Sequence, residues 1–351
     1  MKHCKLLSID LAKNIFQICC LDRNNQEILN RKVKRNKLLE TVLQKNPKTI
    51  VMESCYSATY WGRRFQKHGF EVKLIPPQHV KPFVKGNKND KHDALAIAEA
   101  SLRPHVHFVP VKNEAQQEIQ IMHRIRERYK QERTKLSNQL RGLLSDYGII
   151  IKKGIRHLLA TVPTILEDCE NGLTLYSRIY FEKQLEEIRE KTKQLKTIEK
   201  DIKELSKTQE GYDEAVSVPS IGDITASAII ARVGDGKQFA KARGMTAWLG
   251  IVPKHASSGE KLKMQNISKR GDTYLRTLLI HCGRVIVNRY KDESDPLKQF
   301  ANRIAAKRGK NVAAVAVAHK LARIIWAVLT TKTKYDPKHA QKYVQNLGAK
   351  K

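Results

Sequence analysis

The chain of 351 residues contains 66 Lys and Arg residues against 35 Asp and Glu residues, which gives a formal net charge of +31. Hydrophobic residues account for 41% of the chain, which suits packed cores and excludes a disordered protein. The positive charge predicts a polyanionic partner, nucleic acid before a membrane surface. The length allows about two or three domains.

Neither export nor membrane insertion is indicated. No apolar run looks long enough to span a bilayer, and the N-terminal sequence MKHCKLLSIDLAKN has no signal-peptide core. The six cysteines form no CxxC pair, which predicts reduced thiols and no zinc site. We therefore expect a cytoplasmic protein that does not contact a membrane.

The first hundred residues predict a mixed β-sheet covered by helices. Strands that come first in hairpins and then alternate with helices are typical of such an α/β unit. Apolar and alternating runs predict strands at 6–21 (two strands with a turn at Lys13–Asn14), 26–34, 49–52 and 72–75. Helices are expected at 36–44 and 58–68, and a turn at Pro76–Pro77.

Four acidic residues stand at the ends of these elements. Asp10 and Glu53 each follow a buried strand, where an acid is costly unless it is paired or coordinates a metal. Asp90 and Asp93 share one face at the start of an evident helix. They can be an N-cap and a first-turn acid, or they can be ligands of a divalent cation.

This order of acids resembles the ribonuclease-H-like (RuvC-like) fold of Holliday-junction resolvases and many transposases. The resemblance implies that Asp10, Glu53, Asp90 and Asp93 converge at one edge of the sheet. Four carboxylates there would hold two Mg²⁺ ions, about 3.5–4 Å apart, over a phosphate.

Two long amphipathic runs follow, over 113–147 and 182–207, where apolar residues recur at helical intervals. They predict the arms of an antiparallel helical hairpin or an intermolecular coiled coil. A helical spacer with a solvated, charged face is the simpler alternative. The segment between them, 148–181, is expected to be irregular.

The remainder is expected to be all-α. The segment 216–232 predicts a turn and a helix, and its sequence VPSIG resembles the hairpin of a helix-hairpin-helix element. Backbone N–H groups around Ser220 and Gly222 could then hold a phosphate, and an ordinary capped helix is the alternative. Further helices are expected at 239–249 and, as a pair, within 297–330, before a basic tail.

A second unusual stretch, GIVPKHASSGEKLKMQNISKRGDTYLR, covers residues 250–276. Ser257 and Ser258 lie in a polar loop before a glycine, which is ordinarily a turn. Basic residues follow and can form a general phosphate patch. They are Lys269, Arg270 and Arg276, the last on an expected helix.

Order and spacing resemble one family over residues 5–335. The N-terminal D…E…DxxD set and the C-terminal VPSIG…WLGIVP…SSG…ISKRGDxYLR block are similar to those of DEDD insertion-sequence transposases. These are known as bridge-RNA-guided serine recombinases and are related to the pilin-gene DNA invertase. The resemblance implies a metal-binding domain at 1–110, long helices at 111–210, a domain with the catalytic serine at 211–335, and a basic tail at 336–351.

The resemblance also implies a mechanism. The four acids would hold Mg²⁺ at the scissile phosphate, and Ser258, which directly precedes the glycine, would attack to form a phosphoserine link to DNA. Ser257 is the local alternative. Proximity in sequence alone suggests that Lys269, Arg270 and Arg276 would neutralise phosphate charge.

The implied partners are donor and target DNA, a non-coding bridge RNA that pairs with both, and further copies of the chain in a dimer or tetramer. The implied setting is a bacterial cytoplasm, in association with the nucleoid. Two other functions are possible on the same residues. A junction-resolving nuclease would use water as its nucleophile, and a non-catalytic nucleic-acid scaffold would use the acids as caps and core partners.

Overall fold

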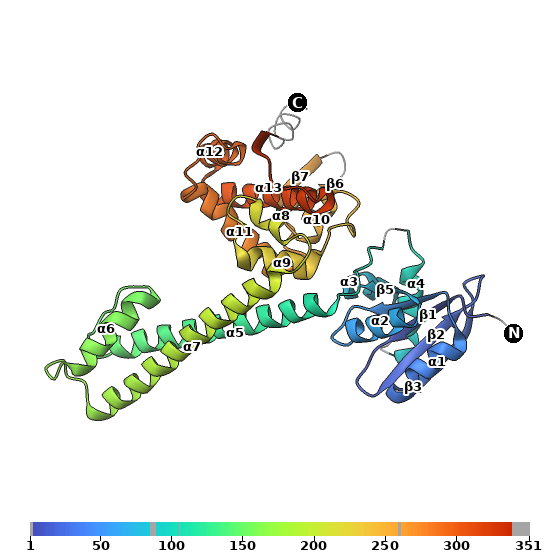
Figure 1. The fold of residues 1–351 in the computed structure, drawn as a ribbon, viewed down its shortest axis with the longest axis horizontal. Helices are drawn as coiled ribbons and strands as arrows, with labels where there is room; N and C mark the ends of the chain where they lie inside the picture. Colours follow the sequence, from blue (N-terminus) through green and yellow to red (C-terminus); the bar gives the residue numbers. More distant parts are fainter. Residues whose placement is uncertain (1–2, 85–88, 105, 259–260, 339–351) are drawn as a thin grey trace. The chain divides into compact units, whose positions relative to one another are not determined.

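The computed structural model describes residues 3–84, 89–104, 106–258 and 261–338, without the side chains of residues 255–258 and 261–264. The chain forms two compact units, Met1–Glu114 (the N-terminal unit) and Ala115–Lys351 (the C-terminal unit) (Figure 1). The first contains a mixed sheet with helices and the second is mainly helical, which confirms the predicted fold class at this level.

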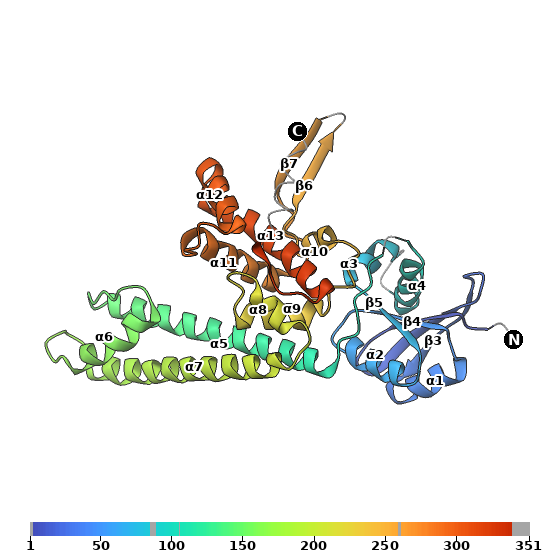
Figure 2. The same ribbon diagram turned by 45° about the horizontal axis from the view of Figure 1, so that its top comes forward.

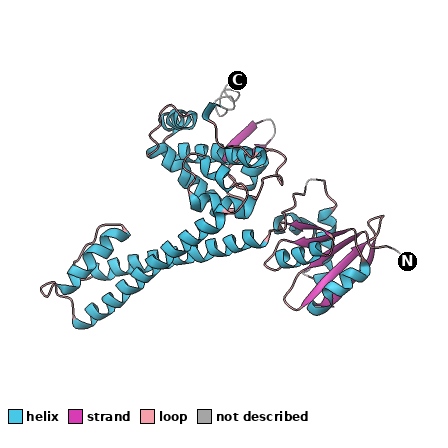
Figure 3. Cartoon of the chain, in the orientation of Figure 1, coloured by secondary structure: helices cyan, strands magenta, loops and turns pink. Residues whose placement is uncertain are grey.

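The N-terminal unit is built on five strands. Its elements are β1 (Leu6–Asp10), β2 (Ile15–Leu21), β3 (Glu27–Lys34), a 3-10 turn (Arg35–Lys37), α1 (Leu38–Lys45), β4 (Thr49–Glu53), α2 (Ala58–Lys67), β5 (Glu71–Ile75), α3 (Pro77–Val80), a second 3-10 turn (Lys81–Phe83) and α4 (Asp90–Ser101). The strand order is β3-β2-β1-β4-β5. Figure 3 shows the strands of this sheet in magenta, with helices in cyan. The three strands β1 to β3 pair antiparallel, whereas β1, β4 and β5 pair parallel, as the hairpin-then-alternation pattern predicted.

Alternation along the strands gives the sheet two different faces, because successive side chains point to opposite sides. One face packs against α1 and α2 through a core that includes Leu7, Ile9, Phe16, Ile50 and Met52. The other face packs against α4 through Leu6, Cys19, Leu21, Val51 and Ile75. The α4 face therefore also carries the residues that lie two or four positions from these along the same strands, among them Ser8, Asp10, Gln17 and Glu53.

α4 approaches the sheet closely because its buried side consists largely of alanines, such as Ala94 and Ala98. The Ser8 hydroxyl donates a 2.6 Å hydrogen bond to the carbonyl oxygen of Ala94. This bond ties β1 to the helix just after its first turn.

Two local predictions in this unit are wrong. A short helix, α3, begins at Pro77 instead of a simple turn, since proline suits the first position of a helix. Asp90 is not the N-cap of α4. Asn89 has the extended backbone, and its side chain accepts a hydrogen bond from the Lys91 N–H, so Asp90 is the first helical residue.

The C-terminal unit contains long helices, a helical core and one β-hairpin. Its elements are α5 (Glu114–Ser145), α6 (Ile155–Glu167), α7 (Leu175–Lys207), α8 (Tyr212–Ser217), α9 (Asp223–Val233), α10 (Ala242–Trp248), β6 (Pro253–Ser258), β7 (Lys261–Ile267), α11 (Thr273–Asn288), α12 (Pro296–Arg308) and α13 (Lys310–Thr331).

α5 and α7 are the two predicted long helices, and they run antiparallel within the chain. Arg126 of α5 lies 2.6 Å from Glu199 of α7, and Glu132 of α5 lies 3.0 Å from Lys191 of α7. Residue numbers in these contacts rise along α5 and fall along α7, as expected for antiparallel helices. The segment 148–181 is not irregular, because it contains α6 and the start of α7. Pro163 inside α6 obscured the helical pattern of this segment.

α13 lies in the core of the C-terminal unit, where Val317, Leu321 and Ile325 are buried. Gly283 of α11 packs against it so closely that a Cβ would overlap the backbone carbonyl of Ala314. By length and composition α13 could span a membrane, which corrects the expectation that no such run exists. Half of its apolar stretch is buried within the unit, as in a core helix.

Candidate active site

Asp10 and Glu53 end two neighbouring parallel strands. The β1–β4 register pairs Ile9 with Met52, so Asp10 and Glu53 come next, at the same edge of the sheet. Side chains at matching positions on neighbouring strands point to the same face, which here is the α4 face. The parallel pairing of β1 and β4 thus brings together two acids that are far apart in the sequence.

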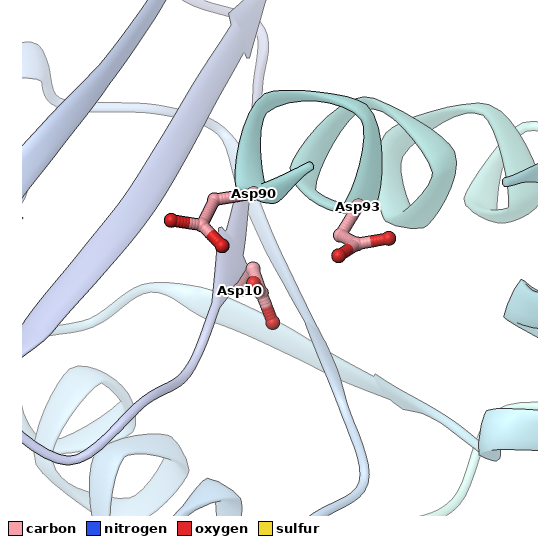
Figure 4. Close-up of side chains that lie close together, drawn as sticks. All are labelled: Asp10, Asp90 and Asp93. Atoms are coloured by element: carbon pink, nitrogen blue, oxygen red, sulfur yellow. The ribbon is translucent and has the colours of Figure 1, made fainter. Parts of the chain in front are cut away.

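Asp90 and Asp93 lie on the first turn of α4, with Asp10 beneath them (Figure 4). One carboxylate oxygen from each of Asp10, Asp90 and Asp93 lies within 4.8 Å of the other two. Three negative charges at this separation repel one another unless a cation or a proton compensates. The structure therefore brings three of the four predicted acids into one group.

Glu53 is connected to this group electrostatically. Burial, and then the charge of Asp93, raise the pKa of Glu53 above the ordinary value of a glutamate. Among the described residues, Glu53 is not one of the three whose oxygens are mutually close. It stands at the edge of the group, on the same end of the sheet as Asp10.

The donor set fits a hard divalent cation. Such ions prefer carboxylate oxygens, and an octahedral Mg²⁺ about 2.1 Å from each ligand spans about 4.2 Å between opposite oxygens. Small side-chain rotations would bring the oxygens of the three aspartates to this spacing. The Lys32 ammonium lies 3.0 Å from the Asp90 carboxylate.

Sequence reasoning missed three residues around the acids: Gln17, Asn30 and Lys32. Gln17 pairs with Asp10 in the β1–β2 register, and its Nε2 donates to Asn30 Oδ1 at 2.6 Å. Asn30 Nδ2 in turn donates to the carbonyl oxygen of Lys91, on α4, at 3.1 Å. The signal was a glutamine within the apolar run IFQICCL, and the alternation of EILNRKVK.

Ser258 does not lie in a loop, which corrects the prediction. β6 and β7 form an antiparallel hairpin, and Ser258 pairs with Lys261 at the far end of β6. Figure 2 shows the hairpin projecting from the helices of the C-terminal unit. Ser258 and the alternative Ser257 thus belong to the C-terminal unit, whereas the four acids belong to the N-terminal unit.

Two glycines form the base of this hairpin. A Cβ on Gly250 would overlap the backbone of Arg270, and one on Gly271 would overlap the carbonyl oxygen of Trp248. The Lys269 N–H donates to the Gly250 carbonyl oxygen at 3.0 Å. The side chains of Lys269 and Arg270 are exposed at this base, where a phosphate can reach them.

Arg276 does not join Lys269 and Arg270 as an exposed basic residue. It is only 7% exposed, and its guanidinium donates to the Leu249 carbonyl oxygen at 2.9 Å and to the Thr273 hydroxyl at 3.1 Å. A guanidinium held in this way stabilises the chain before the hairpin. These contacts give Arg276 a structural role, and its phosphate contact stays a prediction.

Ser220 and Gly222 lie in the loop between α8 and α9. The Ser220 hydroxyl donates to the Cys282 carbonyl oxygen at 3.1 Å, and Gly222 is the N-cap of α9. Asp223, the first residue of α9, lies 3.0 Å from Lys203 and already places negative charge at this helix end. Phosphate binding at this loop stays a prediction.

Comparison with known proteins relates both units to one family. A DEDD transposase family model of the IS110 type matches residues 7–149, and the model for the transposase IS116/IS110/IS902 family matches residues 213–299. The chain is 39% identical over 335 residues to the transposase for insertion sequence element IS1111A of Coxiella burnetii, which aligns 95% of this chain with 92% of that protein.

Two further relatives are similar along their whole length. A probable family 20 transposase of Pseudomonas aeruginosa is 39% identical over 332 residues, which are 94% of this chain and 98% of that protein. The transposase for insertion sequence element IS1328 of Yersinia enterocolitica is 38% identical over 343 residues, or 96% and 100% of the two chains.

The matched regions contain the candidate residues. The four acids fall within residues 7–149 and Ser258 within residues 213–299. Membership of a DEDD family implies the use of a divalent metal, which the grouped aspartates fit. The chain belongs to the IS110/IS116 family of insertion-sequence transposases and is an enzyme that acts on DNA.

Proposed function

We propose that this transposase cuts and rejoins DNA through a phosphoserine intermediate on Ser258, with Mg²⁺ held by Asp10, Glu53, Asp90 and Asp93. The observation that carries the proposal is the group of aspartate oxygens within 4.8 Å of one another at the end of β1. The strand order, with α4 across one face, supports a ribonuclease-H-like assignment of the N-terminal unit.

All four acids of the proposed metal site are anchored on regular structure. Asp10 and Glu53 project from neighbouring strands, and Asp90 and Asp93 project from a helix that is hydrogen-bonded to the sheet. The four carboxylates are therefore held on rigid elements. When bound, Mg²⁺ (two ions in the full proposal) would polarise the scissile phosphate. Lys269 and Arg270 would neutralise neighbouring phosphates.

The serine step keeps the phosphate ester bond energy in the protein–DNA link. The Oγ of Ser258 forms a bond to phosphorus while the bond from phosphorus to the 3′ oxygen breaks. The serine proton passes to solvent or to a carboxylate, and the departing 3′ oxygen takes up a proton from solvent and leaves as a hydroxyl. Attack of another strand's 3′-hydroxyl on the phosphoserine then rejoins DNA without hydrolysis. The two units must meet for this step, within one chain or between two copies.

We further infer that sequence recognition relies on a bridge RNA that pairs with donor and target DNA, while the protein binds backbone phosphates. The net charge of +31 supports a role in binding two nucleic acids. Exchange of strands requires several active sites, which favours a dimer or tetramer. A cytoplasmic, nucleoid-associated location follows from this function.

A strand-cleavage assay that also detects the protein–DNA adduct tests the proposal. With Mg²⁺ and the paired RNA, the wild type should form a denaturant-resistant adduct. Ser258→Ala should abolish it, and Ser257→Ala, one residue away on the same strand, should retain it. An adduct in Ser258→Ala would refute the serine assignment.

The same assay distinguishes the alternative functions. Metal-dependent cleavage by Ser258→Ala without an adduct would favour a junction-type nuclease that uses water. Cleavage that survives Asp10→Asn would discredit the carboxylate site and favour a non-catalytic role for the acids.

A further inference from the structure

A chain of side-chain hydrogen bonds runs from the sheet to the first turn of α4. Gln17 Nε2 on β2 donates to Asn30 Oδ1 on β3 at 2.6 Å, and Asn30 Nδ2 donates to the Lys91 carbonyl oxygen at 3.1 Å. Lys91 lies between Asp90 and Asp93 in the sequence. The link therefore ends on the backbone turn that carries two of the three grouped aspartates.

This link begins beside the third aspartate. Gln17 is the cross-strand partner of Asp10, and directly opposed residues on antiparallel strands point to the same face. The Ser8 bond to the Ala94 carbonyl oxygen is a second anchor, one turn further along α4. Two polar anchors, from Ser8 on β1 and from Asn30 on β3, thus fix the start of α4 against the sheet.

Stability of the fold does not explain why Gln17 is buried. The side chain is 2% exposed, and its Oε1 has no hydrogen-bond partner among the described residues. An unpaired buried acceptor lowers the stability of the fold, and an apolar side chain of similar size would avoid that cost. The amide group of Gln17 is therefore better explained by what its Nε2 holds than by packing.

We propose that Gln17 and Asn30 are positioning residues of the transposase, which set the distance between Asp10 on β1 and the aspartates on α4. This inference rests on the proposed metal site. Neither residue needs to touch the metal, because both act through the backbone at Lys91. Loss of the link should loosen the first turn of α4 and weaken cation binding without unfolding the sheet.

Hydrogen exchange on the full-length, metal-free protein tests the first half. The Asp93 N–H is bonded to the Asn89 carbonyl oxygen at 3.0 Å and reports on the first turn. In Gln17→Leu its exchange should be about fivefold faster, the effect of losing one hydrogen bond of about 1 kcal/mol. Amides in β1 and β4 should be unchanged. Gln66→Leu, an exposed glutamine on α2, is the matched control.

Binding of Mn²⁺ to the full-length protein without DNA, followed by electron paramagnetic resonance, tests the second half. Gln17→Leu and Asn30→Ala should each weaken binding by about fivefold, and the double variant should be no weaker than either one, because both break the same link. Gln17→Asn, which keeps the amide but shortens its reach, should behave like Gln17→Leu and excludes an effect of polarity alone.

The outcomes separate this inference from the metal site itself. If Asp10→Asn binds Mn²⁺ as well as the wild type, the metal site is wrong, and the exchange of the Asp93 N–H alone decides whether the link positions α4. If Asp10→Asn loses Mn²⁺ while Gln17→Leu binds it like the wild type, the positioning role is wrong. A lowered melting temperature with unchanged Mn²⁺ affinity would likewise reduce Gln17 to a packing residue.

Discussion

The Lys32 ammonium lies 3.0 Å from the Asp90 carboxylate, so the chain itself supplies a cation to the aspartate group. The two side chains are 63% and 57% exposed, and an exposed pair of this kind is worth at most about 1 kcal/mol. Lys32 can therefore partly offset the repulsion among the acids without closing the site to a divalent ion.

Replacement of Lys32 by Gln should tighten metal binding. The variant removes a competitor for Asp90 and a positive charge that repels the incoming ion, so the Mg²⁺ concentration for half-maximal cleavage should fall, by up to about fivefold. Titration of Mg²⁺ in the cleavage assay measures this. Lys34→Gln, an exposed lysine on the same strand, should leave the midpoint unchanged. An unchanged midpoint in Lys32→Gln would show that the pair does not compete with metal.

Replacement of Glu53 by Gln should separate activity from stability. Burial and the charge of Asp93 raise the pKa of Glu53, so ionisation of this carboxyl is less favourable in the folded protein than in the unfolded chain. A raised pKa contributes stability at low pH that is lost as pH rises through the folded value. Metal-free Glu53→Gln should therefore unfold at a higher denaturant concentration than the wild type at pH 7.5, and the gap should shrink toward pH 4.

The same variant should lose cleavage, because a neutral amide is a poorer ligand for a hard cation, and a loss of at least about 100-fold is expected for a metal ligand. Denaturation in the presence of a chelator and cleavage with Mg²⁺ are measured on the same preparation. A variant that is less stable than the wild type and fully active would contradict both the destabilising effect of the Glu53 charge and the role of Glu53 as a metal ligand.

The strand acids were predictable, whereas the details around them were not. Asp10 and Glu53 stand out because each ends an apolar run, and neighbouring parallel strands bring such ends together. The N-cap reading of Asp90 misses by one residue, because backbone geometry places Asn89 at that position. Gln17 was not singled out, since its partner Asn30 becomes a neighbour only in the folded sheet.

In the C-terminal unit the errors have a common cause. In the β6–β7 hairpin only β7 begins with alternating polar and apolar residues (KLKMQ), whereas β6 (PKHASS) has no such pattern, so the sequence did not mark two paired strands. Arg276 was expected in a basic patch because the sequence does not show which loop covers its helix. In the fold, the Leu249 carbonyl oxygen accepts a hydrogen bond from the Arg276 guanidinium. The local sequence gives the chemistry of each side chain, but not how far the fold buries it.

His123 should make the C-terminal unit sensitive to acid. It is 2% exposed, and its ring nitrogens lie 3.0 Å from the Tyr274 hydroxyl and 3.0 Å from the Ser227 hydroxyl. Burial, with the charges of Arg126 and Arg232, lowers the pKa of His123 to about 3. Since the unfolded chain binds this proton near the ordinary pKa of about 6.5, stability is full at pH 7 and falls between about 6.5 and 3.

Between pH 7 and pH 5 the loss from His123 should be about 2 kcal/mol. Denaturant unfolding followed by α-helical circular dichroism at both pH values measures it. His123→Gln, which retains hydrogen bonding without titrating, should remove most of this pH dependence even where it lowers stability at pH 7. His157, which is exposed on α6, provides the control substitution, and His157→Gln should keep the wild-type slope.

Gly271→Ala should destabilise the unit that carries the serine hairpin. Gly271 has φ of +104°, and its Cβ would overlap the carbonyl oxygen of Trp248, which is backbone and cannot rotate away. An L-residue is strained at this φ even without the overlap, so a loss of about 3 kcal/mol or more is expected. Unfolding by denaturant gives the loss, and a soluble variant should also form less adduct, because the hairpin base moves.

Gly142→Ala is the matched change with the opposite sign. Gly142 lies inside α5, and a Cβ there meets no atom within 4 Å. Alanine should stabilise this helix by about 0.5–1 kcal/mol, because glycine loses more backbone entropy on folding. If Gly271→Ala were as stable as Gly142→Ala, the Trp248–Gly271 contact would not define the base of the hairpin. Ser258 would then be held by the β6–β7 pairing alone.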